Sequence, residues 1–265
     1  MFTPLTTRWL AIGVLAAAVV AFLLTAWRDA RRTQYRPVQY PLYWIGLVLT
    51  RILWRARIIG RLQLPTDSGA VIVCNHRSPI DPAFVGLASK LAVHWMVARE
   101  YFAVPGFGAC LRIVGAIPTR RGGVDTEAVK STIRYARQGE VVGLFPEGKI
   151  NITDQLLLPL RSGAVAIALA ARVPIVPCFI EGSPHDKKTF YGCFFRSART
   201  TLRIGQPFDL TEYYDRSDDR NLLDELTLRI GRAMATLAGR PDYEPEPAGR
   251  RRRDPVRDEA ESPTV

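Results

Sequence analysis

Short apolar runs rich in β-branched residues alternate with helix-like stretches between residue 65 and about residue 206, and this alternation constrains the fold most. The runs are AVIVC (70–74), VVGLF (141–145) and VPIVPCFI (173–180). Two of the stretches between them, 126–138 and 161–172, have the composition of helices. Strands that alternate with helices predict an α/β domain whose largely parallel sheet is buried between flanking helices.

Two predicted strands are followed by polar residues of the kind that carry out chemistry. His76 comes just after the strand at 70–74, and Glu147 comes just after the strand at 141–145. In a parallel α/β sheet, the ligand site lies beyond the carboxyl ends of the strands. We therefore expect the functional site at this edge of the sheet.

The remaining pattern completes the predicted domain. TTLRIG (200–205) has the composition of a further strand, and residues 220–237 predict a helix whose apolar side chains recur once per turn. His94 lies in a predicted strand and His185 in a predicted loop. Neither has a comparable set of polar neighbours, so we expect structural or solvent roles for both.

His76 and Asp81 lie five positions apart in the sequence NHRSPID. Asn75, Ser78 and Pro79 favour a turn, and such a turn could bring the Asp81 carboxylate to one nitrogen of the imidazole. The carboxylate would fix the tautomer and leave the other nitrogen to accept a proton, as in the base and orienting group of a catalytic triad. A turn histidine that caps a helix is the simpler interpretation of an isolated pair.

No nucleophile accompanies this pair. The sequence contains no GxSxG motif, and the Cys74 side chain would point away from its neighbour in a continuing strand. A base at this place would therefore act on a hydroxyl group of the substrate. The four cysteines show no metal-binding spacing, and three lie in or beside apolar runs, which indicates reduced structural thiols and a domain facing the cytoplasm.

The N-terminal region contains a long apolar segment. Residues 9–27, WLAIGVLAAAVVAFLLTAW, include no charged residue and have a tryptophan at each end. Such a segment is long enough to cross a bilayer with interfacial tryptophans as anchors. Four arginines follow it and one precedes it, so we expect the N-terminus outside and the rest of the chain in the cytoplasm. A cleaved signal peptide, the alternative, would have a shorter apolar core and a small-residue cleavage site.

Two further segments flank the α/β pattern. Residues 40–61 begin without charge and then contain four arginines. They suit a helix at the membrane interface whose arginines reach phosphate headgroups, although an amphipathic helix packed on the domain fits equally well. The sequence from Arg240 onward is rich in proline and charge and lacks an apolar period, which predicts disorder.

Three short motifs follow NHRSPID in order along the chain. They are GAIPTRR (115–121), FPEGKI (145–150) and VPIVPC (173–178). Together the four motifs resemble the ordered blocks of the glycerolipid acyltransferases, that is, the 1-acylglycerol-3-phosphate acyltransferases and their relatives, over residues 70–180. Each motif alone is weak evidence, but four motifs in the order and spacing of the family make the resemblance specific. Residues 173–177 resemble wall residues near the acyl chain, and a buried strand explains them equally well.

The resemblance implies roles for the matching residues. His76 would deprotonate the acceptor hydroxyl, and Asp81 would orient the imidazole. Arg121, with Arg120 beside it, resembles the ligand of the acceptor phosphate, since a guanidinium can hold phosphate through two parallel hydrogen bonds. Glu147 resembles the acceptor-binding carboxylate of the family.

Four further residues are substrate-binding candidates at the same motifs. Asn75 and Arg77 flank His76, and Gly148 would let the backbone approach the ligand. After this glycine the family usually continues Thr-Arg-Ser, whereas this chain continues Lys-Ile-Asn. Lys149 is therefore our candidate for the phosphate contact of the missing arginine. This difference from the family sequence affects the identity of the acceptor more than the type of reaction.

The sequence patterns and the resemblance together predict the following organisation and activity. A membrane anchor (1–36) and an interfacial amphipathic segment (37–64) precede an acyltransferase domain (65–239) and a disordered charged tail (240–265). The enzyme, single-pass or monotopic on the cytoplasmic face, would move an acyl group from a coenzyme A or acyl carrier protein thioester to a lysophospholipid. 1-Acylglycerol-3-phosphate, which gives phosphatidic acid, is the expected acceptor, and no cofactor or metal is expected beyond the thioester co-substrate.

Other function classes fit only part of the sequence. A non-catalytic lipid-binding protein at the membrane surface would need neither His76 nor Asp81. The net charge of +11 would also suit a nucleic-acid partner, but the signatures of nucleic-acid-binding modules are absent and the arginines cluster near the anchor and in the tail. We expect membrane lipids, a lysolipid acceptor and an acyl thioester donor as partners, and no nucleic acid. An acyltransferase for a different lysolipid is the nearer alternative.

Overall fold

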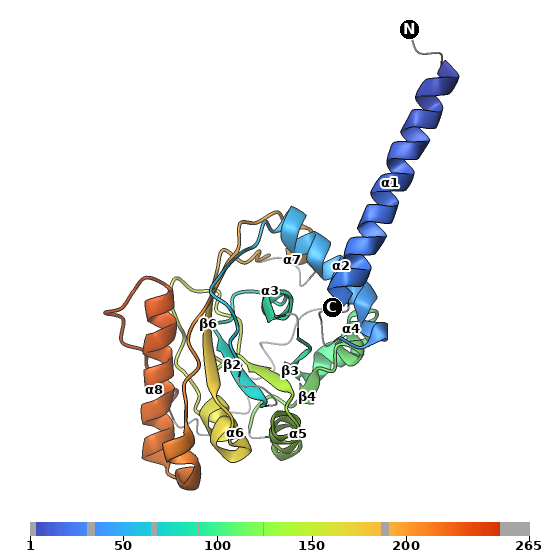
Figure 1. Cartoon of the computed structure of the whole chain (residues 1–265). Helices are drawn as coiled ribbons and strands as arrows, with labels where there is room; N and C mark the ends of the chain where they lie inside the picture. Colours follow the sequence, from blue (N-terminus) through green and yellow to red (C-terminus); the bar gives the residue numbers. More distant parts are fainter. Residues whose placement is uncertain are drawn as a thin grey trace.

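The computed structural model describes residues 4–30, 35–64, 68–89, 91–123, 125–186 and 191–249. A seven-stranded sheet forms the centre of the body, and the helix α1 (Pro4–Ala30) projects from one end of it (Figure 1). The strands are β1 (Arg57–Ile59), β2 (Ala70–Cys74), β3 (Val93–Ala98), β4 (Ile117–Thr119), β5 (Val141–Leu144), β6 (Ile175–Glu181) and β7 (Thr201–Ile204).

The strand order is β1-β7-β6-β2-β5-β3-β4, and every neighbouring pair is parallel except β6 and β7. The predicted α/β fold with a largely parallel sheet is thus confirmed. β2 lies at the centre and is buried throughout, because its sequence AVIVC presents apolar side chains to both faces. The carboxyl ends of β6, β2, β5, β3 and β4 meet at one edge of the sheet.

Helices cover both faces of the sheet. They are α2 (Tyr40–Val48), α3 (Asp81–Ser89), α4 (Phe107–Ile113), α5 (Thr126–Arg137), α6 (Gly163–Ala171), α7 (Gly192–Phe195) and α8 (Arg220–Leu237), with the shorter turns η1 (Pro37–Gln39), η2 (Leu49–Leu53), η3 (Arg99–Ala103) and η4 (Thr211–Arg216). Successive side chains of a strand point to opposite faces. Val71 and Val73 of β2 therefore pack with α5, α6 and α8, whereas Ile72 and Cys74 pack with α3 on the other face.

The segment 37–64 is part of the domain, so the predicted domain start at residue 65 was wrong. Trp54 is fully buried, and β1 pairs with β7 as the edge strand of the sheet. Tyr43 of α2 is also buried, as a helix packed on the domain requires, while Ile45 and Val48 of α2 remain exposed. The sequence did not predict the edge strand, because the residues of this strand are exposed and lie among arginines.

The predicted N-terminal helix is present as α1, and its described apolar side chains are largely exposed. Among the described residues, no helix has both the length and the apolar character that a membrane crossing requires. The predicted membrane span is therefore not supported by this structure.

The first residues of the predicted disordered tail lie against the body, so that prediction was wrong for 240–249. The backbone of Leu160 exchanges hydrogen bonds with Glu246 and Ala248 at 2.8 Å, and the Tyr243 hydroxyl donates to the Leu157 carbonyl at 3.1 Å. Proline-rich sequence lacks a helical or strand period, yet its carbonyls and N–H groups can still pair with a neighbouring loop. Residues 250–265 lie outside the described part of the chain.

The cysteines behave as structural thiols. None of the four forms a disulfide. Cys74, Cys178 and Cys193 are buried, and burial raises the pKa of the Cys178 thiol to about 12 and that of Cys193 to about 11. Burial also raises the pKa of Cys74 well above its ordinary value. These thiols are therefore protonated and poorly nucleophilic, in agreement with the prediction.

Candidate active site

The predicted pair of His76 and Asp81 forms at the carboxyl end of β2. His76 Nδ1 lies 3.0 Å from Asp81 Oδ2, and Asp81 is the fully buried first residue of α3. The same Oδ2 atom accepts the backbone N–H groups of Arg77 and Ser78 at 2.6 and 2.7 Å. Because a carboxylate only accepts hydrogen bonds, the proton of the neutral imidazole lies on Nδ1 and Nε2 is left as the acceptor.

Aromatic stacking fixes the plane of the His76 ring. The ring lies on Phe145 with centroids 3.8 Å apart and planes 8° apart, and Phe145 stacks on Trp95 at 4.5 Å. A Cβ atom at Gly143 would lie 2.5 Å from the Trp95 ring, so this stack requires glycine there. The His76 side chain is 16% exposed, and no described residue forms a hydrogen bond with its Nε2. The ring is thus held at one edge and one face while Nε2 can accept a proton.

The Glu147 carboxylate supports the same turn from the end of β5. Its Oε1 atom accepts the His76 N–H at 2.8 Å, and its Oε2 atom accepts the Leu158 N–H at 2.9 Å. Burial raises the pKa of Glu147, against the opposing effect of these two N–H groups. The motif resemblance assigned this carboxylate to the acceptor, which stays a prediction, and in this structure each of its oxygens accepts a backbone N–H. The structure therefore gives Glu147 the part of holding the His76 backbone in place.

Asn75 and Arg77, which the sequence predicted as substrate ligands, bind backbone groups of the protein in this structure. The buried Asn75 amide bridges to the backbone of Ile180, accepting its N–H at 2.7 Å and donating to its carbonyl at 2.9 Å. The Arg77 guanidinium donates to three carbonyl oxygens of the loop 151–155 at 2.7–3.1 Å. Asn75 thus joins the ends of β2 and β6, and Arg77 holds the loop that follows Lys149.

The predicted phosphate ligands lie further along the same edge of the sheet. Arg120 and Arg121 follow β4, which is three strand spacings, or about 14 Å, from β2. Arg121 Nε lies 2.6 Å from Glu100 Oε1, and both side chains are 40% exposed. The Arg121 guanidinium also lies 5.7 Å from the centroid of the Tyr101 ring. The structure therefore does not bring Arg121 next to the pair, but leaves it on the same edge.

Gly148 adopts a positive φ of +70°, and the group nearest to it is a cation. A Cβ atom at Gly148 would lie 2.8 Å from the guanidinium carbon of Arg161. Gly148, Lys149 and Arg161 are all exposed. The chain thus carries two cations beside Gly148, and sequence reasoning identified only Lys149, because Arg161 belongs to the segment before α6.

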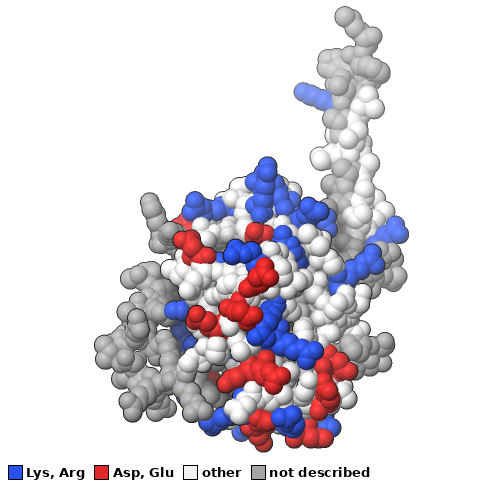
Figure 2. All heavy atoms as spheres, turned by 90° about the vertical axis from the view of Figure 1, so that its left-hand side faces the viewer, with Lys and Arg blue, Asp and Glu red and all other residues white. Residues whose placement is uncertain are grey.

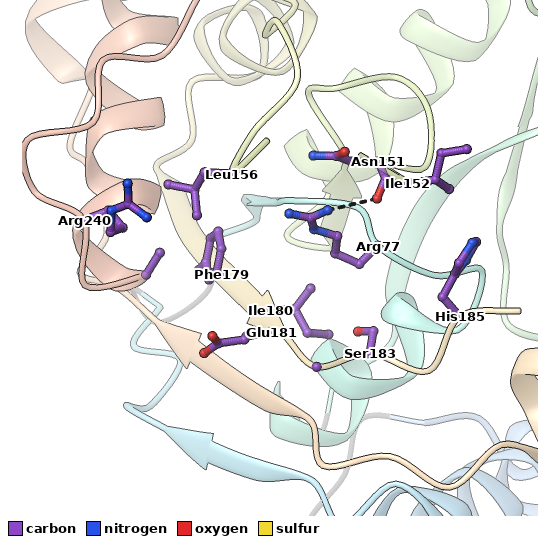
Figure 3. A pocket seen from close by; sticks show the side chains of 12 residues that line it. Arg77, Asn151, Ile152, Leu156, Phe179, Ile180, Glu181, Ser183, His185 and Arg240 are labelled. Atoms are coloured by element: carbon purple, nitrogen blue, oxygen red, sulfur yellow. Dashed lines mark hydrogen bonds between the residues drawn. The ribbon is translucent and has the colours of Figure 1, made fainter. Parts of the chain in front are cut away.

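A cavity of about 530 Å³ lies beside the pair, between the end of β6, the loop after Lys149 and the end of α8 (Figure 3). Figure 3 shows Arg77 near its middle, bonded to Asn151, with Phe179, Leu156 and Arg240 on one side and His185 on the other. The lining also includes Ser183, whose hydroxyl contacts Asp81. The cavity therefore combines apolar walls with cationic groups close to the His76–Asp81 pair.

Comparison with known proteins identifies the family. The family model described as Acyltransferase matches residues 55–181. The 1-acyl-sn-glycerol-3-phosphate acyltransferase of Bacillus subtilis is 30% identical over 158 residues, which cover 59% of this chain and 75% of the relative. This chain belongs to the glycerolipid acyltransferase family. It is an acyltransferase, as the four motifs predicted.

Two further similarities agree with this family. A chloroplastic 1-acyl-sn-glycerol-3-phosphate acyltransferase of Brassica napus is 28% identical over 133 residues, which cover 49% of this chain and 38% of the relative. The crystal structure of the 1-acyl-sn-glycerophosphate acyltransferase of Thermotoga maritima has the same fold, with a TM-score of 0.53 and 20% identity over 71% of this chain and 80% of that one.

Sequence reasoning missed one polar contact of this acyltransferase. The Ser183 hydroxyl donates to Asp81 Oδ1 at 2.6 Å, so the carboxylate is bound at both oxygens. Ser183 follows β6 just after Gly182, a glycine with a φ of +72°. A signal was available, because β6 ends at the same edge as β2 and a polar residue follows it. His94, assigned a structural role, stacks on Tyr135 inside the body.

Proposed function

We propose that this acyltransferase transfers a fatty acyl group from a coenzyme A or acyl carrier protein thioester to the free hydroxyl of a lysophospholipid. 1-Acylglycerol-3-phosphate is the proposed acceptor and phosphatidic acid the product, as the names of the relatives from Bacillus subtilis and Brassica napus suggest. The observation that carries the proposal is the His76–Asp81 pair, in which Nδ1 is bound to the carboxylate and Nε2 is left as the acceptor.

The proposed reaction uses this pair as a general base and its orienting group. His76 Nε2 takes the proton of the acceptor hydroxyl while the hydroxyl oxygen attacks the thioester carbonyl carbon. The tetrahedral adduct then collapses, the carbon–sulfur bond breaks, and the leaving thiolate takes the proton from the imidazolium. Asp81 stabilises the imidazolium between these steps. A positioned base of this kind contributes about 10²–10⁴-fold to the rate. Neither a cofactor nor a metal is part of the proposal.

Arg121, with Arg120 beside it, is the proposed ligand of the acceptor phosphate. Its present partner, Glu100, is a half-exposed carboxylate, and an exposed ion pair contributes only about 0–1 kcal/mol. A hydrogen bond to a charged group contributes about 1.5–3 kcal/mol, so a phosphate that binds in a bidentate way can replace the carboxylate. Lys149 follows Gly148, which lies against Arg161, and is proposed as a second phosphate contact.

The cavity of Figure 3 supports the same reaction class. Leu156 and Phe179 give it apolar walls, and Arg240 is one of its lining cations. A fatty acyl thioester and a lysolipid both combine an apolar chain with anionic groups. A mixed lining next to the base suits either molecule better than it suits a small polar substrate.

The helix α1 is proposed to attach the enzyme to the surface of a membrane. Its exposed side chains include Trp9, Val14 and Leu15, each about two-thirds exposed, and apolar side chains in this number favour a lipid environment. The arginine excess after the helix supports the cytoplasmic face as the proposed location of the domain. Protease digestion of sealed membrane vesicles tests this proposal. A domain that protease digests only from the non-cytoplasmic side of the membrane contradicts it.

The direct test of the proposed activity is a transfer assay with the purified full-length chain. Each of several lysophospholipids is offered with acyl-coenzyme A and with acyl–acyl carrier protein, and product formation is followed by mass spectrometry. We expect transfer to 1-acylglycerol-3-phosphate and loss of that transfer in His76→Ala. Binding of lysolipid without transfer from either donor would support the non-catalytic alternative and contradict the proposal.

A further inference from the structure

The short helix α7 has two faces with opposite surroundings. On its inner face, Cys193 is buried in the same apolar cluster as Ile80, and its thiol lies against the Ser78 hydroxyl. Both of these neighbours belong to the turn that joins His76 to α3. On its outer face, the Phe195 side chain is 81% exposed, the highest value for a large apolar side chain in the described residues. α7 therefore lies between the active-site turn and the outside of the protein.

The segment that follows α7 runs beside η2. The Ala198 N–H donates to the Leu53 carbonyl at 3.2 Å, and Arg55 Nη2 donates to the Ser197 hydroxyl at 2.8 Å. Next to this contact, Ile52 of η2 is 73% exposed. Two segments that are far apart in the sequence thus present exposed apolar side chains on adjoining parts of the surface.

Exposed arginines lie close to these apolar residues along the chain. Arg51, Arg55 and Arg57 lie on or after η2, and Arg196 follows α7; all four are exposed, and none has a carboxylate within salt-bridge distance among the described residues. Figure 2 shows lysine and arginine side chains gathered at the top of the body, the end from which α1 projects. The surface combines an apolar centre with cationic surroundings, which is complementary to an anionic bilayer.

We propose that η2 and α7 form a docking face for an anionic phospholipid bilayer, with Ile52 and Phe195 inserted and with Arg51, Arg55, Arg57 and Arg196 at the headgroups. This inference rests on the proposed function, because it places a lipid acceptor near the base. A helix with its side chains is about 10 Å thick, so a bilayer in contact with Phe195 lies about one helix thickness from the His76 turn. α1 attaches the enzyme, whereas the docking face orients its active site toward the lipid.

The position of Phe195 can be measured directly in the full-length chain. In a Cys110→Ser background, Phe195→Cys is labelled with a thiol-reactive fluorophore and the protein is reconstituted into vesicles that contain phosphatidylglycerol. We expect quenching by lipid-borne nitroxides and protection from aqueous iodide. The matched control, Arg220→Cys, labels the first turn of α8 and should give the reverse result. A label at position 195 that iodide quenches as strongly as the control overturns the proposal.

The effect of the docking face on activity can be measured separately from the acyl-transfer step. The Phe195→Ser variant should lose about tenfold in kcat/KM for lysolipid presented in vesicles, the low end of the tenfold to hundredfold effect of one buried phenylalanine. Its turnover of a short-chain lysolipid dissolved as monomers should stay unchanged. Equal loss on both acceptors would show that α7 only supports the active-site turn, and would overturn the docking face.

Two more outcomes separate this inference from its alternatives. The Arg51→Gln/Arg57→Gln variant should lose vesicle activity only when anionic lipid is present, whereas Arg220→Gln should not change it; equal loss on neutral vesicles contradicts the charge argument. Concentration-dependent dimerisation in detergent that Phe195→Ser abolishes would assign the face to a second copy of the chain and overturn the proposal. Should the wild type transfer no acyl group, the proposed function fails, but the quenching experiment still decides whether the face meets lipid.

Discussion

The Glu147→Gln substitution replaces one carboxylate oxygen by an amide group and tests whether Glu147 holds the His76 backbone. Each Glu147 oxygen accepts one backbone N–H, from His76 or from Leu158. In the variant, one of these N–H groups faces an amide donor and is left unsatisfied, at a cost of about 1–3 kcal/mol. Burial raises the pKa of Glu147, so removal of the charge recovers part of a desolvation penalty. The expected loss of unfolding free energy is therefore near the lower end, about 1 kcal/mol.

The substitution also loosens the base, and that effect distinguishes our assignment from the one that the motif resemblance implies. We expect kcat to fall, because the His76 ring moves relative to Asp81, while KM for acceptor and donor changes little. Denaturant unfolding and steady-state kinetics on one preparation measure both effects. Glu127→Gln, an exposed carboxylate of α5, is the matched control and should change neither. Unchanged stability together with a raised KM for the acceptor alone would refute our reasoning and return Glu147 to the acceptor.

Three further predictions follow from other contacts. Arg121→Ala should raise KM for a phosphate-bearing acceptor about tenfold to a hundredfold and leave KM for the donor nearly unchanged; an equal rise for both would make the residue structural. Ser183→Ala removes a hydrogen bond to Asp81 and should lower kcat about tenfold without changing KM, with recovery in Ser183→Thr; unaltered kcat would contradict this. The bond from Arg216 holds the pKa of Asp219 below its usual value, so this carboxylate stabilises α8 above its unfolded-state pKa and loses that effect as the pH falls through its folded-state pKa. The melting temperature of the wild type should thus decline more on acidification than that of Asp219→Asn. Equal declines of the two melting temperatures would refute this role of Asp219.

The central strands could be predicted from the sequence because their apolar runs are continuous. β2, β5 and β6 are buried between two helix layers, and such strands need apolar side chains on both faces. The same reasoning could not find β1, since an edge strand with exposed side chains has no such pattern. It also could not place 240–249 on the body, because the contacts there include backbone hydrogen bonds to Leu160, which composition does not encode.

The active-site residues likewise fall into those that the sequence could pair and those that only the structure could bring together. His76 and Asp81 are five residues apart, so local turn signals were enough to pair them. The groups that hold this pair come from much further along the chain: Glu147 is 71 residues from His76, and Ser183 is 102 residues from Asp81. Only the strand order brings these side chains together. Motif resemblance identified Glu147 as important, but its hydrogen-bond partners could be assigned only from the structure.

The measurement that tests the central claim most directly is acyl transfer by His76→Ala, expressed per folded molecule and compared with thermal unfolding of the same preparation. A general base at this position predicts a loss of at least about 10²-fold in kcat. Asp81→Asn should show a similar loss with little change in KM, because the imidazole loses the carboxylate that fixes its tautomer. If His76 only capped a helix, the melting temperature would fall while turnover per folded molecule stayed nearly the same. Retained turnover in His76→Ala would contradict the mechanism.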